Sequence, residues 1–206
     1  MIAPKAERWA MAKLLLFVVA LIPLGLLVFW VASDQLGPDP AKTVVLYTGS
    51  WALNFLLLAL LVSPLRQWLN RPQLIRARRM LGLFCFFYAS LHAVCVATYI
   101  VGWQWDVFTE ELKERPYMLV GFSAWLTLVP LALTSNRFSV KKLGRKWASL
   151  HKVVYLSTVL ALIHLVWLVR SSYLEAILYT SAAVFLLYWR LPRRLKPRFW
   201  GRSEAF

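Results

Sequence analysis

Cysteine and acidic side chains are both scarce in this chain of 206 residues. Its two cysteines, Cys85 and Cys95, lie inside one apolar stretch, so a disulfide framework or a cysteine-rich metal site is excluded. Neither a G-x-G-x-x-G sequence nor a P-loop is present, and no bound nicotinamide site is therefore visible. With nine acidic residues in all, the sequence also offers no evident catalytic acid–base pair or nucleophile.

Basic and apolar residues are abundant by contrast. The net charge is +15, which raises the question of nucleic-acid binding. The bases, however, flank apolar segments and form no DNA- or RNA-binding pattern, so no nucleic-acid partner is predicted. An apolar fraction of 60% and a mean hydropathy of +0.60 are typical of a protein that crosses a lipid membrane several times. We therefore interpret the positive charge as a determinant of membrane topology.

Six apolar stretches are long enough to span a bilayer, which takes about 20 helical residues. Continuous apolar runs predict helices, because the strands of a membrane barrel alternate. The predicted fold is an all-α membrane protein, a six-helix bundle forming a single domain over residues 1–206, with helices near 14–32, 44–65, 81–103, 117–134, 150–169 and 174–191. The first run could be a signal peptide, but its length of about 19 residues exceeds the roughly 7–15 of a cleaved signal, so we expect a retained helix.

The predicted loops on the two sides of the membrane differ in charge. The loops after the second and fourth helices, together with both termini, hold 20 of the 24 Lys and Arg residues. The opposite loops hold seven of the nine acids. The positive-inside rule therefore predicts that both termini are cytoplasmic, and an even number of helices agrees with that independently.

All three histidines of the chain fall in or at the edge of a predicted span: His92, His151 and His164. An ionisable side chain within a span is a functional-site hypothesis by default. His92 lies thirteen residues past Arg79 and His164 twelve past Lys152, so both lie about 18–20 Å along helices that run in the same direction. His151 lies about 19–20 Å from His164 along a straight helix and on a different face, so those two cannot ligate one metal ion.

The depth match predicts one b-type haem between the third and fifth helices, with His92 and His164 as axial iron ligands. No C-x-x-C-H sequence is present, which excludes covalent attachment of a c-type haem. A stripe of small residues on the third helix permits a close approach at this point, although ordinary helix packing would account for it equally well. The stripe comprises Gly82, Ala89, Ser90 and Ala93.

Two other function classes fit part of this pattern. A small transporter or proton-conducting membrane protein would use the histidines as relay groups, but none of the nine acids lies in the middle of a span. A quinone-linked reductase that acts by itself stays open, because quinone sites have weak sequence signatures.

Four segments, in order between about residues 40 and 170, carry a family resemblance: YTGSWALNFLLLALLVSPL, IRARRMLGLFCFFYASLH, ERPYMLVGFSAWL and KKLGRKWASLHKVVYLSTVLALIH. With these segments the chain resembles the haem-binding membrane subunits of the periplasmic protein-methionine-sulfoxide reductase system. Those subunits belong to the ferric-reductase-like transmembrane group.

The resemblance implies a six-helix inner-membrane protein of a Gram-negative bacterium, with b-type haem and FMN as cofactors. Electrons from the quinone pool or from a cytosolic flavin reductase would pass to a periplasmic molybdopterin-containing catalytic subunit. That partner reduces methionine sulfoxide in oxidised periplasmic proteins. The chain would then be an electron-transfer subunit of an oxidoreductase, with no substrate-catalytic site of its own evident. We expect its acidic outer segments, Asp34–Asp39 and Asp106–Glu114, to form the docking surface.

The resemblance also implies a functional role for all three histidines, but the chain departs from the wider group at one point. That group uses four histidines in two pairs, so a second haem with two histidine ligands is not available here. His151 could ligate a haem with a non-histidine partner, or contact a flavin or a haem propionate. Three arginines on the same side, Arg76, Arg78 and Arg79, are candidate partners for haem propionates or an FMN phosphate, or else topology determinants that face lipid headgroups.

Overall fold

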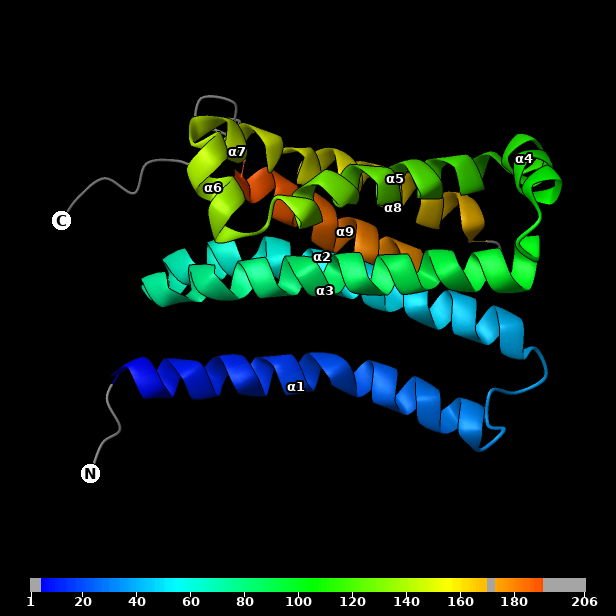
Figure 1. Cartoon of the computed structure of the whole chain (residues 1–206), viewed down its shortest axis with the longest axis horizontal. Helices are drawn as coiled ribbons and strands as arrows, with labels where there is room; N and C mark the ends of the chain where they lie inside the picture. The colour runs from blue at the N-terminus through cyan, green and yellow to red at the C-terminus, as the bar shows by residue number, and fades with distance from the viewer. Residues whose placement is uncertain (1–4, 170–172, 191–206) are drawn as a thin grey trace.

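A computed structural model describes residues 5–169 and 173–190, and all regular structure in these ranges is helical. The long helices lie side by side along the long axis of the molecule, α4 lies at one end, and α6 and α7 lie at the other (Figure 1). The elements are α1 (Lys5–Ala32), α2 (Pro40–Trp68), the 3-10 turn η1 (Pro72–Leu74), α3 (Ile75–Val96), the π-helical turn η2 (Ala97–Val101), α4 (Trp105–Glu114), α5 (Pro116–Leu133), α6 (Arg137–Leu143), α7 (Arg145–Leu150), α8 (Val153–Leu168) and α9 (Tyr173–Arg190).

Five helical segments in the described ranges are long and apolar enough to cross a membrane. They coincide with the first five predicted spans and comprise Trp9–Ala32, Pro40–Trp68, Pro72–Val101, Pro116–Leu133 and Arg145–Leu168. A helix, α9, also forms at the sixth predicted span, but it is not one of the five. The count of six spans and the orientation of the termini therefore stay predictions. Leu191, where the sixth predicted span ends, and the basic tail lie outside the described residues.

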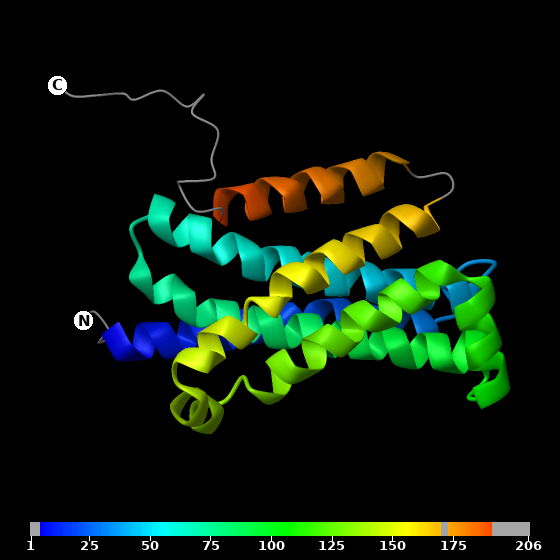
Figure 2. The same ribbon diagram turned by 90° about the horizontal axis from the view of Figure 1, so that it is seen from above.

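Two antiparallel helix pairs, α2 with α3 and α5 with α8, form the centre of the bundle. Helix α9 packs against α2 and α8 on one side, and α1 packs against α3 on another (Figure 2). A cluster of stacked rings fills the space between α2 and α3, where the ring of Phe55 lies 5.1 Å from that of Tyr88 and 5.5 Å from that of Phe84. Burial of these large apolar rings holds the pair in one register.

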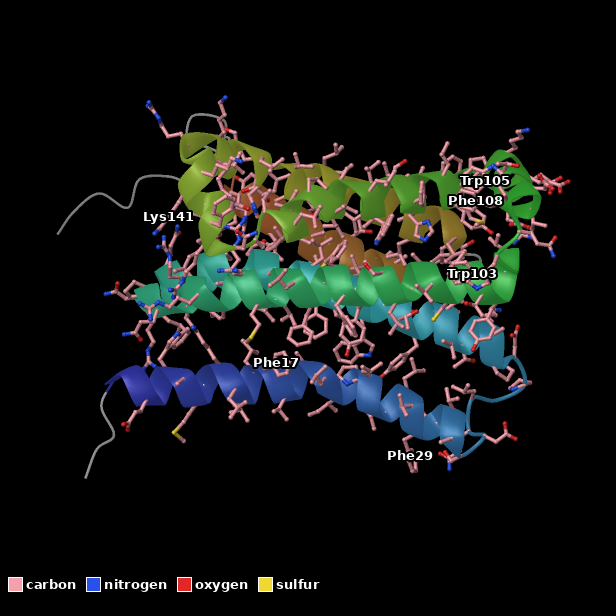
Figure 3. The ribbon with its side chains drawn as sticks, viewed as in Figure 1. Phe17, Phe29, Trp103, Trp105, Phe108 and Lys141 are labelled. Atoms are coloured by element: carbon pink, nitrogen blue, oxygen red, sulfur yellow. The ribbon has the colours of Figure 1, made fainter. Side chains whose placement is uncertain are left out.

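Helix α1 contains Pro23, and Tyr88 of α3 anchors it at this point. The Tyr88 hydroxyl donates to the Ala20 carbonyl at 2.9 Å and accepts from the Leu24 amide at 3.1 Å. In an undisturbed α-helix, the Leu24 amide would bond the Ala20 carbonyl directly. Figure 3 shows Phe17 of α1 pointing toward the bundle and Phe29 pointing away from it, so α1 has one packed face and one outer face.

A turn lies at the start of the predicted fifth span. Helix α7 ends at Leu150 and α8 begins at Val153, with His151 and Lys152 forming a turn between them. The Lys152 amide bonds the Ser149 carbonyl, which is the tighter spacing of a 3-10 turn. Apolar composition alone did not reveal this break.

The ends of α4 show how local sequence positions a short helix. Gly102 and Trp103 have φ values of +64° and +59°, and this left-handed pair redirects the chain from η2 into α4. The segment WDVFTEELKE forms the short helix α4. Pro116 then occupies the first position of α5, where its missing amide hydrogen costs nothing.

Candidate functional site

A cavity of about 300 Å³ lies among α2, α3, α5 and α8, near the end of the bundle that α4 covers. Most of its lining is apolar or small side chains, and Phe108 and Leu112 of α4 contribute to it. Figure 3 shows Phe108 beside Trp105 at this end of the molecule. A concave apolar site with few polar groups is typical of a cofactor or small-molecule pocket.

The polar groups that converge on the cavity include His92 from α3 and His164 from α8. Their ring centroids are 6.3 Å apart, with an angle of 74° between the ring planes. Two imidazoles that ligate one metal ion from opposite sides, each through a bond of about 2 Å, place their centroids about 6 Å apart. The distance and the apolar lining therefore fit a metal-centred planar cofactor between the two rings, although their role as iron ligands stays a prediction.

Hydrogen bonds to the backbone set the tautomer of both rings. Nδ1 of His92 lies 2.9 Å from the Val45 carbonyl oxygen, and Nδ1 of His164 lies 2.7 Å from the Tyr117 carbonyl oxygen. A carbonyl oxygen only accepts, so each Nδ1 carries the hydrogen and donates it. Each Nε2 then keeps its lone pair, which is the arrangement a neutral histidine needs to ligate a metal.

The close approach to these histidines occurs at glycines that sequence reasoning missed. A Cβ at Gly49 or at Gly121 would meet the ring of His92 or of His164, respectively. Gly82, which we expected to permit the approach, has nothing within 4 Å of the corresponding position. Ala89 and Ala93 do line the cavity, and Ser90 accepts a hydrogen bond of 3.0 Å from Nε1 of Trp125.

His151 lies apart from the cavity, at the opposite end of the bundle. Its Nε2 is 3.2 Å from the Thr134 hydroxyl, and its ring stacks on Trp147 at a centroid distance of 4.0 Å. Nε1 of Trp147 in turn donates to the Thr134 carbonyl at 3.0 Å. These contacts tie the turn between α7 and α8 to the end of α5, and they give His151 a structural role whether or not it also contacts a cofactor.

The three arginines considered as candidate partners for a haem propionate or an FMN phosphate point to three different places. The Arg76 guanidinium lies over the Trp9 ring of α1 at 5.9 Å, and that of Arg79 donates to the Ser135 carbonyl. Arg78 alone lies near His151 and interacts with Tyr155 of α8. Of the three, Arg78 is therefore the one placed beside His151.

A fourth arginine, Arg190 of α9, lies near Arg78, and sequence reasoning missed it. Its guanidinium donates to the Leu60 carbonyl at 2.6 Å, to the Ser63 hydroxyl at 3.0 Å and to the Tyr155 hydroxyl at 3.2 Å. It also lies close enough to Arg78 for their charges to repel. In the sequence it reads as the first base of a tail, and only the packing of α9 on α2 and α8 brings it inward.

Comparison with known proteins places the chain in a family. Residues 48–162 match the family described as ferric reductase like transmembrane component. The chain is 44% identical over 193 residues to a protein of Xanthomonas euvesicatoria pv. vesicatoria, with 91% of this chain and 88% of that protein covered. It is 42% identical to a protein of Xanthomonas campestris pv. campestris (95% and 93% covered) and 40% identical to one of Polaromonas naphthalenivorans (90% and 87% covered). All three are named protein-methionine-sulfoxide reductase heme-binding subunit MsrQ.

The chain belongs to the MsrQ family. This confirms the resemblance seen in the four sequence segments. The residues that match the ferric-reductase-like description include His92, Gly49 and Gly121 and end two positions before His164. No solved structure gives a significant match to this MsrQ-family chain.

Proposed function

We propose that the protein is a haem-binding electron-transfer subunit that carries electrons across the membrane within a methionine-sulfoxide reductase system. The observation that carries this proposal is the pair of imidazoles 6.3 Å apart, each with Nε2 left to ligate iron, in an apolar cavity. When bound, a b-type haem would supply the one-electron chemistry at this point. The protein's own part is to hold the two rings, exclude water with apolar side chains and fix the depth of the site.

The proposal extends to the partners and the location. Electrons would enter from the quinone pool or a cytosolic flavin reductase and leave to a periplasmic molybdopterin-containing catalytic subunit, across a bacterial inner membrane. Two facts support these assignments: the relatives are named as heme-binding subunits of a methionine-sulfoxide reductase, and most basic residues of the described ranges belong to segments at the end of the bundle opposite α4. With both termini cytoplasmic, the cavity lies in the periplasmic half of the bundle, close to where an outer partner would accept the electron.

As part of the same proposal, FMN would bind at the end of the bundle that holds His151. Arg78 and Arg190 lie near one another there, while the only ion pair in the described part of the chain joins Arg115 to Glu111 at the other end. An anionic group such as an FMN phosphate or a haem propionate would offset the repulsion between the two guanidinium groups. Of the three arginines considered from the sequence, Arg78 is our candidate for this role, because it lies near both His151 and Arg190.

The test is spectroscopic and uses the full-length protein purified in detergent after expression with a haem supply. A Soret band with the sharp visible bands of a reduced six-coordinate b-type haem is the expected result. Reduction of that haem by a quinol analogue, or by enzymatically reduced flavin, would identify the donor. Protein that is folded and supplied with haem yet shows no Soret band would contradict the proposal and favour a transporter.

A docking prediction follows from the exposed face of α4. Asp106, Glu110 and Glu114 recur every four residues on this face, whereas Phe108 and Leu112 face the cavity. Charge reversal in the double variant E110K/E114K should slow electron transfer to the periplasmic catalytic subunit about threefold to tenfold at low salt, because steering of the partner is lost. Stopped-flow oxidation of the reduced haem by that subunit measures the rate.

The matched control is the E7K variant, since Glu7 is exposed near the start of α1, at the other end of the bundle. Its rate should equal that of the wild type. Equal rates for E110K/E114K and E7K at low salt would show that α4 is not the docking surface.

A further inference from the structure

Each cavity histidine lies against a glycine of the neighbouring helix. A Cβ built on Gly49 of α2 would lie 3.1 Å from both Cε1 and Nδ1 of His92. A Cβ built on Gly121 of α5 would lie 2.7 Å from both Cε1 and Nδ1 of His164, with Cγ at 3.1 Å. In both cases the three nearest atoms belong to the histidine ring, so the missing methyl group leaves room for an imidazole and not for a neighbouring backbone.

The same local arrangement therefore occurs twice. The carbonyl that accepts from Nδ1 belongs to the residue four positions before the glycine, Val45 before Gly49 and Tyr117 before Gly121. Acceptor and histidine are separated by 47 residues in both cases. No repeat is visible in the sequence, yet the pair α2 and α3 and the pair α5 and α8 present their imidazoles to the cavity in the same way.

The helix geometry explains why the glycine must stand at this position. Residues four apart lie one above the other on the same helix face. An imidazole that reaches the carbonyl of the first residue must therefore pass over the Cα of the second. Glycine there lets the ring approach the helix backbone closely, and any side chain would push it away from the carbonyl.

We propose that Gly49 and Gly121 are positioning residues for His92 and His164: they hold each ring in the Nδ1–H tautomer and at a fixed angle. This inference rests on the proposed function, because it assigns a purpose to the ligands of that site. The hydrogen bond from Nδ1 raises the basicity of Nε2, and a more basic ligand favours the oxidised form of the iron. Loss of the bond should therefore move the midpoint potential of the haem to a more positive value.

The contact distances predict a ranking of alanine variants. The G121A variant should disturb the site most, because the ring of His164 has to move away from a Cβ at 2.7 Å. We expect it to lose most of its haem, or to keep a haem with altered low-spin bands and a more positive potential. G49A should keep its haem with a smaller positive shift, because contacts of 3.1 Å need only a few tenths of an ångström of movement. The control is G82A, on the same helix as His92. A Cβ at Gly82 would have no atom within 4 Å, so this variant should match the wild type in haem content and midpoint potential.

A second measurement needs no haem and separates positioning of the ring from general helix packing. In apoprotein prepared without haem, G121A is introduced into the wild type and into the H164A variant, and thermal unfolding is followed in detergent. The alanine should lower the unfolding temperature of the wild type but be tolerated in the H164A variant, which has no imidazole for the Cβ to meet. A failure of G121A to fold that H164A relieves would support the proposal in the same way.

The outcomes that overturn the inference differ from those that overturn the function. Equal penalties for G121A in the two backgrounds would show that the glycine serves helix packing. Identical haem content and potential for G121A and G82A would also overturn it, while a haem-loaded wild type would leave the proposed function standing. Haem-free wild-type protein would instead remove the function itself.

Discussion

Alanine at His164 is expected to remove the haem from the cavity, and alanine at His92 to do the same. The two ring centroids are 6.3 Å apart, and each ring keeps an unprotonated Nε2 that we propose as an iron ligand. Loss of even an outer-shell partner of a metal ligand weakens metal binding by about tenfold or more, so loss of the ligand itself should do at least as much. The haem-to-protein ratio of the purified variants, taken from the Soret absorbance and the iron content, measures the effect.

The matched control for these two variants is H151A. His151 stacks on Trp147 and lies at the other end of the bundle, so the haem of the cavity should survive its replacement. The wild-type iron content then shows whether His151 holds a second haem: a ratio of two that falls to one in H151A would assign it as a ligand. Visible spectra of H92A and H164A that both match the wild type would show that this pair does not ligate the iron.

Phenylalanine at Tyr88 is expected to weaken the attachment of α1 to the rest of the bundle. The ring is fully buried, and its hydroxyl bonds both the Leu24 amide and the Ala20 carbonyl beside Pro23. The Y88F variant keeps the stacking on Phe55 but leaves these groups without that partner. Such a loss in a buried place costs about 1–3 kcal/mol, and a membrane offers no water to replace the bond. Thermal unfolding in detergent, compared at equal protein concentration, measures the loss.

The control for Y88F is Y99F. Tyr99 lies on η2 and is half-exposed, so removal of its hydroxyl should leave the unfolding temperature unchanged. Limited proteolysis adds a local measurement, because a loosened α1 should be cut sooner in the connection between α1 and α2. Equal unfolding temperatures for Y88F and Y99F would show that the hydroxyl does not secure α1.

Much of the fold could be predicted from the sequence because hydropathy and helix length determine it in a membrane. The apolar runs near 44–65 and 117–134 correspond to α2 and α5 within a few residues at each end. The turn at His151 and Lys152 could not be predicted, because it depends on how the end of α5 receives Trp147 and His151 through Thr134. Apolar composition does not report such a contact between helices.

The candidate site also has one part that the sequence predicts and another that it does not. The pairing of His92 with His164 followed from depth along parallel helices, a one-dimensional property that the sequence contains. Gly49 and Gly121 could not be found like this, because their role depends on which face of α2 and α5 is turned toward the histidines. Such a glycine stands four residues after the carbonyl that accepts from the histidine. It can be searched for only once the helix that packs against the histidine is known. Arg190 was missed for a similar reason, since its inward position depends on the packing of α9.

Helix α1 contributes no side chain to the cavity lining among the described residues. The segments that do line it extend from Val45 to Tyr179, and the two histidines are separated by 72 residues. A chain in which α3 has been inserted but α8 has not therefore lacks one of the two imidazoles that we propose as haem ligands. Ligation of a haem by both proposed ligands would thus require α8 to be packed against α5, so assembly of the helix bundle would precede completion of the site.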